Sequence, residues 1–225
     1  MAKTYLLCLA NSKKYGERCI AGVQLMLDAQ AHFHYVKQAG SPRWLRPVSD
    51  AEHGQVPANL VKDISVGDII SFDLIRHCPN EYQTENCLFY MGSIAKVRPA
   101  TLSVQHLDQL VESQSDTLFG NTGRCLSEEE AATVGRSLVL VKPKEVQPYF
   151  TTPYNTKPRV KFRLGDAHYD LPMTDVNFFD KMQEGLESLK GTTSYIAVSL
   201  GVPFEGKYYK LAAGIIYYSE AKAID

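Results

Sequence analysis

The chain has 225 residues and a formal net charge of −1; 44% of its residues are hydrophobic and 22% are charged. This composition is typical of a soluble globular protein with a proper core, and the length allows one large or two small domains. The near-neutral charge excludes a protein that is basic throughout, so any anion-binding surface must be local. No apolar run reaches the ~20 residues of a membrane helix, and the apolar opening at residues 5–10 is too short for a secretory signal. We therefore expect a cytoplasmic protein with no membrane partner.

The five cysteines are an odd number and form no CxxC pair, which argues against a disulfide framework. His77-Cys78 followed by Cys87 matches no zinc template, and His32 and His34 have no further ligands at a recognisable spacing. No glycine-rich phosphate loop and no GxSxG motif occurs. We expect no metal, no cofactor and no catalytic residue, and buried thiols in a reducing compartment.

In chain order, the first half reads as strands separated by polar turns. Residues 5–10, 18–27 and 44–48 form the first three predicted strands, with Asn11 to Gly16 as a turn. Residues 69–75 and 88–97 are expected to pair as a hairpin around the loop at 79–86. Helical spacing of apolar residues predicts a helix over 101–112.

In the second half, Ser127 and Glu130 form a capping box that predicts a short helix. Residues 147–158 are rich in proline, threonine and tyrosine, which favours a linker or a domain crossover. The remaining segments predict a helix capped by Thr174 or Asp175, and strands at 137–141, 159–164, 169–171, 194–200 and 207–218. Many short strands without a βαβ rhythm favour small antiparallel barrels or an α+β fold over a parallel sheet.

The single tryptophan lies in a distinctive extended stretch. Alternation along a strand points Trp44 and Arg46 one way and Leu45 and Pro47 the other. A flat aromatic beside a guanidinium suits a base, a phosphate or a carboxylate. The alternative is that Trp44 is an ordinary core residue with Arg46 as its solvated neighbour.

Residues 157–164 alternate strictly between cations and apolar side chains. On a strand, Lys157, Arg159, Lys161 and Arg163 share one face, with neighbours about 6.6 Å apart. This is close to the spacing of phosphates in an extended single strand, so the stripe could track a nucleic-acid backbone. The alternative is a solvated outer face whose charges prevent edge pairing and are neutralised by nearby carboxylates.

Two further polar segments could carry chemistry. Gln83, Glu85 and Asn86 lie in a loop between strands, where amides can read base edges and Glu85 could accept a proton; a solvated hairpin loop is the alternative. Asp175 could be catalytic, but a helix cap also explains it. Tyrosines near Lys210 in the last strand could stack on bases or be half buried in a sheet.

Several motifs, taken together, resemble one protein family. Cys8 to Lys14, Arg18 to Gly22 and Trp44 to Ser49 are similar to the opening of the dual OB domain family. Later similarities lie at Gln83 to Asn86, Thr117 to Gly120, Tyr169 to Asp175, Ser199 to Gly201 and Tyr209 to Leu211. The resemblance implies two OB-like barrels in a prokaryotic protein associated with conflict with mobile elements, and recognition of nucleic acid or a nucleotide. The polar positions that match are Arg18, Trp44, Arg46, Gln83, Glu85, Asn86, Asp175 and Lys210.

We therefore expect a mainly β fold with a few helices, arranged as two small OB-like barrels. Residues 1–148 would form the first barrel with inserted helices, and residues 149–225 an OB-like unit with one helix. The expected function is recognition of single-stranded nucleic acid or of a nucleotide in a prokaryotic defence-type system. The expected protein partner is a helicase or nuclease encoded nearby. The expected contact residues are Arg18, Trp44, Arg46, Gln83, Glu85, Asn86, Arg159, Lys161, Arg163 and Lys210. Two alternatives stay open: an enzyme using Glu85 and Asp175 with Arg18 or Lys210, and a protein-interaction module with the tyrosine-rich tail as its interface.

Overall fold

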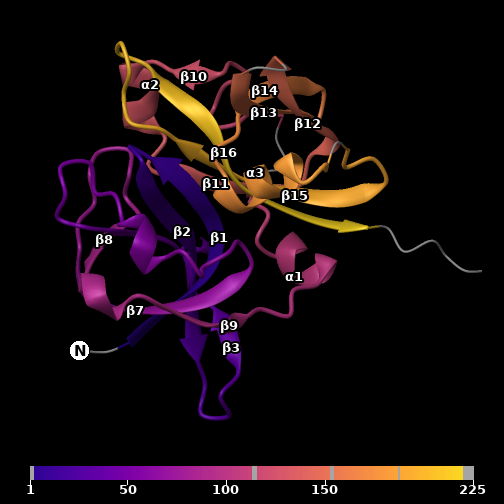
Figure 1. The fold of residues 1–225 in the computed structure, drawn as a ribbon. Helices are drawn as coiled ribbons and strands as arrows, with labels where there is room; N and C mark the ends of the chain where they lie inside the picture. Colours follow the sequence, from indigo (N-terminus) through magenta and orange to yellow (C-terminus); the bar gives the residue numbers. More distant parts are fainter. Residues whose placement is uncertain (1–2, 113–115, 153–154, 187, 220–225) are drawn as a thin grey trace, which may run out of the picture.

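The computed structural model describes residues 3–112, 116–152, 155–186 and 188–219. Two groups of strands make up most of this part of the chain, and Figure 1 shows the N-terminal group below the C-terminal group. The prediction of a mainly β fold of OB-like barrels is confirmed.

The first half holds nine strands and two short 3-10 helices. These are β1 (Lys3–Lys14), β2 (Glu17–Leu27), β3 (Phe33–Tyr35), β4 (Lys37–Gln38), β5 (Ser41–Pro42), β6 (Trp44–Val48), η1 (Ala58–Leu60), β7 (Asp68–His77), β8 (Asn86–Phe89), η2 (Met91–Ser93) and β9 (Ala95–Pro99). Strands β1, β2, β6, β8 and β7 are neighbours in that order, and β7 pairs back to β1, which closes a barrel. Only the β6–β8 pairing in this ring is parallel. Numbered along the barrel, the order is 1-2-3-5-4-1, which is that of an OB fold.

The second half repeats this strand order and contains a longer helix, α3. Its elements are α1 (Val104–Asp108), β10 (Cys125–Leu126), α2 (Glu128–Thr133), β11 (Leu138–Val141), β12 (Lys144–Thr152), β13 (Asn155–Leu164), β14 (Ala167–Pro172), α3 (Val176–Gln183), β15 (Thr192–Leu200) and β16 (Tyr208–Ser219). Strands β12, β13 and β14 form one sheet, and β16, β15 and β11 belong to another. A parallel bridge between Met173 and Ala212 links the two sheets, and β11 leads directly into β12.

Three large hydrophobic clusters, and a smaller fourth one that includes Tyr82 and Tyr208, hold the molecule together. One lies inside the first barrel and includes Leu6 and Cys8; another lies inside the second barrel and includes Phe162 and Phe178. The third lies between the barrels, where Leu7 and Leu9 of β1 meet residues of α1, β11, β15 and β16. Both faces of β1 are therefore buried, which explains its continuous apolar run. A shared apolar core of this kind fixes the two barrels to each other.

Glycine permits close approach where β16 crosses β1. A Cβ at Gly214 would collide with the carbonyl oxygen of Leu9, at a separation that no side chain can tolerate. The two strands, one from each barrel, can thus pack backbone to backbone.

Four local predictions were wrong. The strand expected over 88–97 is interrupted by η2, so that β8 ends at Phe89 and β9 begins at Ala95, although both strands pair with β7 as expected. Asn11 to Lys14 continue strand β1 instead of forming a turn, because the buried Asn11 side chain donates a hydrogen bond of 2.7 Å to the carbonyl of Ile64. The helix expected over 101–112 is limited to 104–108. The expected linker at 147–158 is a hairpin of β12 and β13, apart from residues 153–154, which lie outside the described part.

Strand pairing also indicates where the first barrel ends and the second begins. Strand β11 pairs with β15, so residues 138–141 belong with the second barrel. We therefore propose a boundary between β9 and β11, ahead of the division at 148/149 expected from the sequence.

Candidate functional site

Strand β6 carries Trp44 and Arg46 on the side that faces the second barrel. Leu45 between them packs inside the first barrel, as the alternation predicts. Trp44 lies in the cluster between the barrels with 8% of its surface exposed, and its indole N–H donates to the carboxylate of Glu112. The ring therefore has no free face on which a base could stack.

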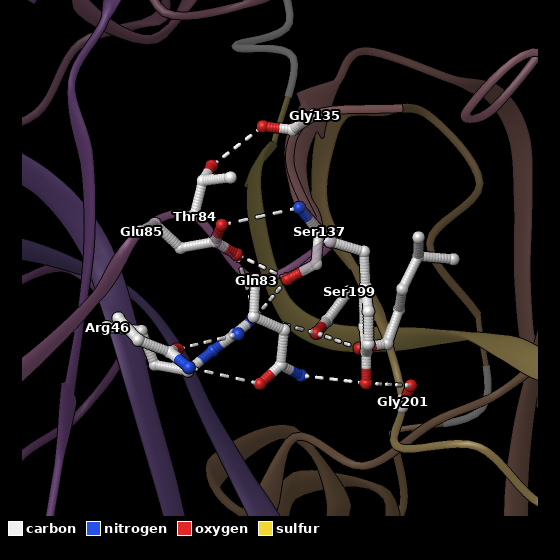
Figure 2. Close-up of polar contacts among 11 residues, drawn as sticks. Arg46, Gln83, Thr84, Glu85, Gly135, Ser137, Ser199 and Gly201 are labelled. Carbon is white, nitrogen blue, oxygen red and sulfur yellow. Dashed lines mark hydrogen bonds and ion pairs between the residues drawn. The ribbon is translucent and has the colours of Figure 1, made fainter. Parts of the chain in front are cut away.

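Arg46 is the centre of a buried polar network at the junction of the barrels (Figure 2). Its Nη2 lies 3.0 Å from a carboxylate oxygen of Glu85, and it donates to the hydroxyls of Ser137 at 2.7 Å and Ser199 at 3.4 Å. Its Nη1 donates to Asn86 at 3.2 Å. Ser137 also donates to Glu85 from both its hydroxyl and its backbone N–H. Because Ser137 and Ser199 belong to the second half, this network joins the two barrels.

The loop between β7 and β8 faces the second barrel and is not a solvated hairpin loop. Gln83 accepts a hydrogen bond from Asn86 and donates one to the hydroxyl of Tyr82, which donates in turn to the carbonyl of Gly201. Thr84 donates to the carbonyl of Gly135. Figure 2 shows Gln83 between Arg46 and Gly201. The polar run 83–86 thus connects the barrels.

A pocket of about 300 Å³ opens beside this network. It is bounded by the end of β1 and the β1–β2 turn, by the loop between β7 and β8, and by the loop between β15 and β16. In OB folds the loops between strands 1 and 2 and between strands 4 and 5 are ligand-binding elements. The polar and aromatic residues on which its chemistry depends are Lys13, Lys14, Tyr15, Arg46, Gln83, Phe204 and Tyr209.

The charge of this pocket is positive. Lys13 and Lys14 make no side-chain hydrogen bond or ion pair within the described residues, and no carboxylate lines the pocket there. Burial lowers the pKa of Lys14, and the nearby Arg46 guanidinium lowers it further. Arg18 stands opposite Lys13 on β2 and does not line the pocket; its guanidinium donates to the carbonyl of Glu17. Glu17 stands opposite Lys14, but its carboxylate accepts the backbone N–H of Ala58.

Aromatic rings rim the same pocket. Tyr15 is 58% exposed and stacks on His53 with ring centres 4.0 Å apart, so one of its faces is covered and the other is open. Phe204 is 63% exposed and lies beside Tyr209, over whose ring the guanidinium of Arg124 is placed at 6.0 Å. Exposed rings next to unpaired cations suit a ligand that has both a flat face and negative charge.

The predicted cationic stripe on β13 has the expected geometry. Val160, Phe162 and Leu164 point into the core of the second barrel, while Arg159, Lys161 and Arg163 face away from it.

The charges of this stripe are balanced within the sheet. Arg159 is 2.8 Å from Asp170 and Arg163 is 2.9 Å from Glu145. Lys161 stands opposite Asp170 and lies 4.8 Å from the ring centre of Tyr149.

Lys210 and Asp175 have structural partners. Lys210 is fully buried, donates to the backbone and side-chain oxygens of Asn121 at 2.8 and 2.6 Å, and has its pKa lowered to about 8 by burial. Asp175 accepts the backbone N–H groups of Asn177, Phe178 and Ile215, so it caps α3 and ties it to β16. Burial raises the pKa of Asp175 to about 6.

The two carboxylates of the alternative enzyme mechanism are held in different surroundings. Glu85 contacts Arg46 and Ser137, whereas Asp175 contacts backbone groups of α3 and β16. Neither lines the pocket. Within the described ranges, no group of three or more His, Cys, Asp or Glu side chains is placed to hold a metal ion.

The tyrosines of the last strand are mostly covered. Tyr208 packs against Tyr82 with ring centres 4.6 Å apart, and Tyr217 contacts Phe178 and Lys181.

No helix in the described part of the chain is long and apolar enough to cross a bilayer.

Of the residues that line this pocket, the sequence-based prediction named Arg46 and Gln83 but not Lys13, Lys14, Tyr15 and Phe204. The available signal was two cations and a tyrosine just before the glycine of the first turn. Phe204 lies in the loop between β15 and β16 of the second barrel, and its place beside the first turn of the first barrel could be recognised only once both barrels were in place.

The strand order and the pocket define a tandem OB-fold protein with a basic, aromatic-lined site between its barrels. The model of the family described as "Dual OB-containing domain" matches residues 4–215, and the chain belongs to this family. No curated protein matches the sequence.

Solved structures with some similarity include HIN-type domains. The crystal structure of the tetrameric p202 HIN2 is 11% identical, covers 96% of this chain and 91% of its own, and has a TM-score of 0.26. A murine DNA-binding protein bound with double-stranded DNA is 7% identical, covers 97% of this chain and 98% of its own, and has a TM-score of 0.31. Similarity at this level says nothing about what this chain binds.

Proposed function

We propose that this protein binds nucleic acid, in single-stranded form, or a nucleotide, in the pocket between its barrels. The observation that carries the proposal is the combination of Lys13 and Lys14, both without a side-chain partner among the described residues, with the exposed rings of Tyr15 and Phe204 in one pocket. Cations contribute attraction for phosphates, and base–aromatic stacking contributes about 1–3 kcal/mol per base.

The form of the ligand follows from the rings. Stacking on Tyr15 or Phe204 needs an unpaired base whose flat face is accessible. The bases of a duplex are stacked on each other, so a single strand or a free nucleotide fits this site better than double-stranded nucleic acid. Arg46 and Gln83 line the pocket from the first barrel and would contact the ligand at its deepest point.

The stripe on β13 remains a predicted second contact. Arg159 and Arg163 already have carboxylate partners, so their attraction for phosphate is weaker than that of Lys13 and Lys14. Lys161 would be its most available cation because it is exposed.

The test is a titration of labelled single-stranded DNA and RNA at two salt concentrations, with a duplex of the same sequence for comparison. We expect binding that weakens with salt, since each neutralised phosphate of a single strand adds about 0.7 to the logarithmic salt slope. Absence of binding at low salt, or an affinity that is indifferent to salt, would overturn nucleic-acid binding.

The wider role that the family resemblance implies is part of this proposal. The protein would act in the cytoplasm of a prokaryote as the recognition subunit of a defence-type system, together with a helicase or nuclease encoded nearby. Copurification of such a partner with the tagged chain would support this role. Unrelated neighbouring genes and a chain that copurifies with neither enzyme would count against it.

A further inference from the structure

We propose that the pocket takes one nucleotide unit with a free phosphate, either a nucleoside monophosphate or the phosphorylated end of a strand. This inference rests on the proposed function and narrows it, because it excludes an internal stretch of nucleic acid as the ligand of the pocket.

The size and depth of the pocket favour a single unit. Its volume of about 300 Å³ is at the lower end of the range of about 300–1,000 Å³ for small-molecule sites. Its lining combines the exposed rings of Tyr15 and Phe204 with the buried residues Ser12, Arg46 and Leu200. An internal nucleotide could enter only if the strand on both of its sides passed back over the rim, whereas an end needs a single path.

The charge of the pocket matches a terminal phosphate. Lys13 and Lys14 both line the pocket from the end of β1, and neither has a side-chain partner in the described part of the chain. Neighbouring side chains on a strand point to opposite faces, and the half-buried Lys14, which lies near Arg46, is the lysine that faces the interior of the pocket. A phosphomonoester carries about −1.5 to −2 charges near neutral pH. A phosphodiester inside a strand carries a single charge, so the positive pocket attracts it less strongly than it attracts a terminal phosphate.

A buried donor at the floor also lacks a partner. The Nε of Arg46 makes no hydrogen bond, although the rest of this guanidinium is bonded to Glu85, Asn86, Ser137 and Ser199. Buried N–H groups are nearly always satisfied by protein, water or ligand. Arg46 lines the pocket, so a shift of the side chains that cover this nitrogen on ligand binding would let an acceptor oxygen supply the missing partner.

The remaining walls provide a place for the base. Phe204 and Tyr209 come from the second barrel, whereas the two lysines come from the first. A nucleotide can therefore lay its base against the rings of one barrel while its phosphate meets the cations of the other. Ligand binding then depends on both barrels being held together by the Arg46 network.

The experiment compares linear and circular single-stranded DNA of one sequence and length, with the linear form phosphorylated at the 5′ end, at the 3′ end, or at neither. AMP, adenosine and inorganic phosphate serve as competitors. We expect a phosphorylated end to bind at least about tenfold more tightly than the circle, and AMP to compete while adenosine and phosphate compete weakly. If AMP binds directly and no strand does, the ligand is a free nucleotide, which supports the assignment of the pocket and identifies the source of the phosphate.

Three outcomes would overturn the inference. Equal affinity of circle and linear strand shows internal binding, and the proposed function then survives without the narrower ligand. Competition by phosphate as strong as that by AMP shows a simple anion site. Binding of neither strand nor AMP removes both proposals.

Two variants place the effect in the pocket. Phe204→Ala removes an exposed ring, so the fold should be unaffected, and Lys14→Ala removes one cation. Both should weaken the preference for a phosphorylated end, whereas the exposed Lys190→Ala, which lies outside the pocket, should preserve it. A preference that is unchanged in both pocket variants would place the binding elsewhere.

Discussion

Arg46 and Glu85 form a buried ion pair with 3.0 Å between Nη2 and the carboxylate, at the junction of the two barrels. Ser137 and Ser199 of the second barrel bond to the same pair. Removing one partner of such a pair leaves a buried charge uncompensated. The pair therefore controls the stability of the junction as well as the floor of the pocket.

The first prediction concerns this pair. Glu85→Gln should lower the free energy of unfolding by about 3 kcal/mol, because it leaves the Arg46 charge buried without a counterion. Combining Arg46→Met with Glu85→Leu should recover part of the loss. Urea denaturation of the single and double variants measures both effects.

The matched control for this prediction is Glu145→Gln. Glu145 pairs with Arg163, but its side chain is 62% exposed, so the change should cost no more than about 1 kcal/mol. Similar losses for the two glutamine variants would contradict a special contribution from the buried pair.

The second prediction concerns the lysines of the pocket. Lys13→Ala combined with Lys14→Ala should weaken binding of single-stranded nucleic acid and lower its logarithmic salt slope by up to about 1.4, the value reached if each lysine neutralises one phosphate charge at about 0.7 each. The exposed pair Lys62→Ala with Lys190→Ala removes the same charge outside the pocket and should leave the slope within error. If both double variants lose slope equally, only net charge matters and the pocket is not the site.

The third prediction concerns the stripe on β13. Arg159→Ala with Arg163→Ala would flatten the salt slope by up to about 1.4 if both arginines contact phosphate, at about 0.7 each. Because Asp170 and Glu145 already pair with them, we expect a smaller effect than that of the pocket lysines. Titrations of the two double variants side by side rank the surfaces, and a larger loss for the arginine pair would move the main contact to β13.

The fourth prediction is a pH dependence. Burial raises the pKa of Asp175 to about 6, above its ordinary value of 3.8. Between these two pH values the folded protein keeps a proton on Asp175, whereas the unfolded chain has released it. The stabilising contribution of this proton is complete at pH below about 4 and is lost as the pH rises through about 6. Asp175→Asn keeps a side chain that can cap α3 but cannot titrate.

Denaturation of the parent and Asp175→Asn between pH 4 and pH 7 measures this effect. As the pH rises, the parent should lose up to about 3 kcal/mol of unfolding free energy relative to Asp175→Asn. The reason is that each unit of pKa shift corresponds to about 1.4 kcal/mol. A difference that stays constant across this range would show that Asp175 keeps its ordinary pKa.

Local patterns in the sequence determined the strands and their faces. The period of two placed Val160 and Phe162 in the core and Arg159 and Arg163 outside it, because side chains alternate across any strand whatever it pairs with. The same rule set Leu45 apart from Trp44 and Arg46, and the Ser127–Glu130 capping box correctly marked α2. The family and its OB-like barrels could also be predicted, since they are carried by motifs along the whole chain.

Only the tertiary structure decided what these faces meet. The buried surroundings of Trp44 and Glu85, and the carboxylates that balance the β13 stripe, depend on residues distant in sequence, such as Glu112, Ser137 and Asp170. The pocket likewise combines the first turn of one barrel with a late loop of the other. Periodicity reports whether a side chain faces inward or outward, but the charge and burial of its surroundings arise from packing between barrels, and no local pattern encodes that packing.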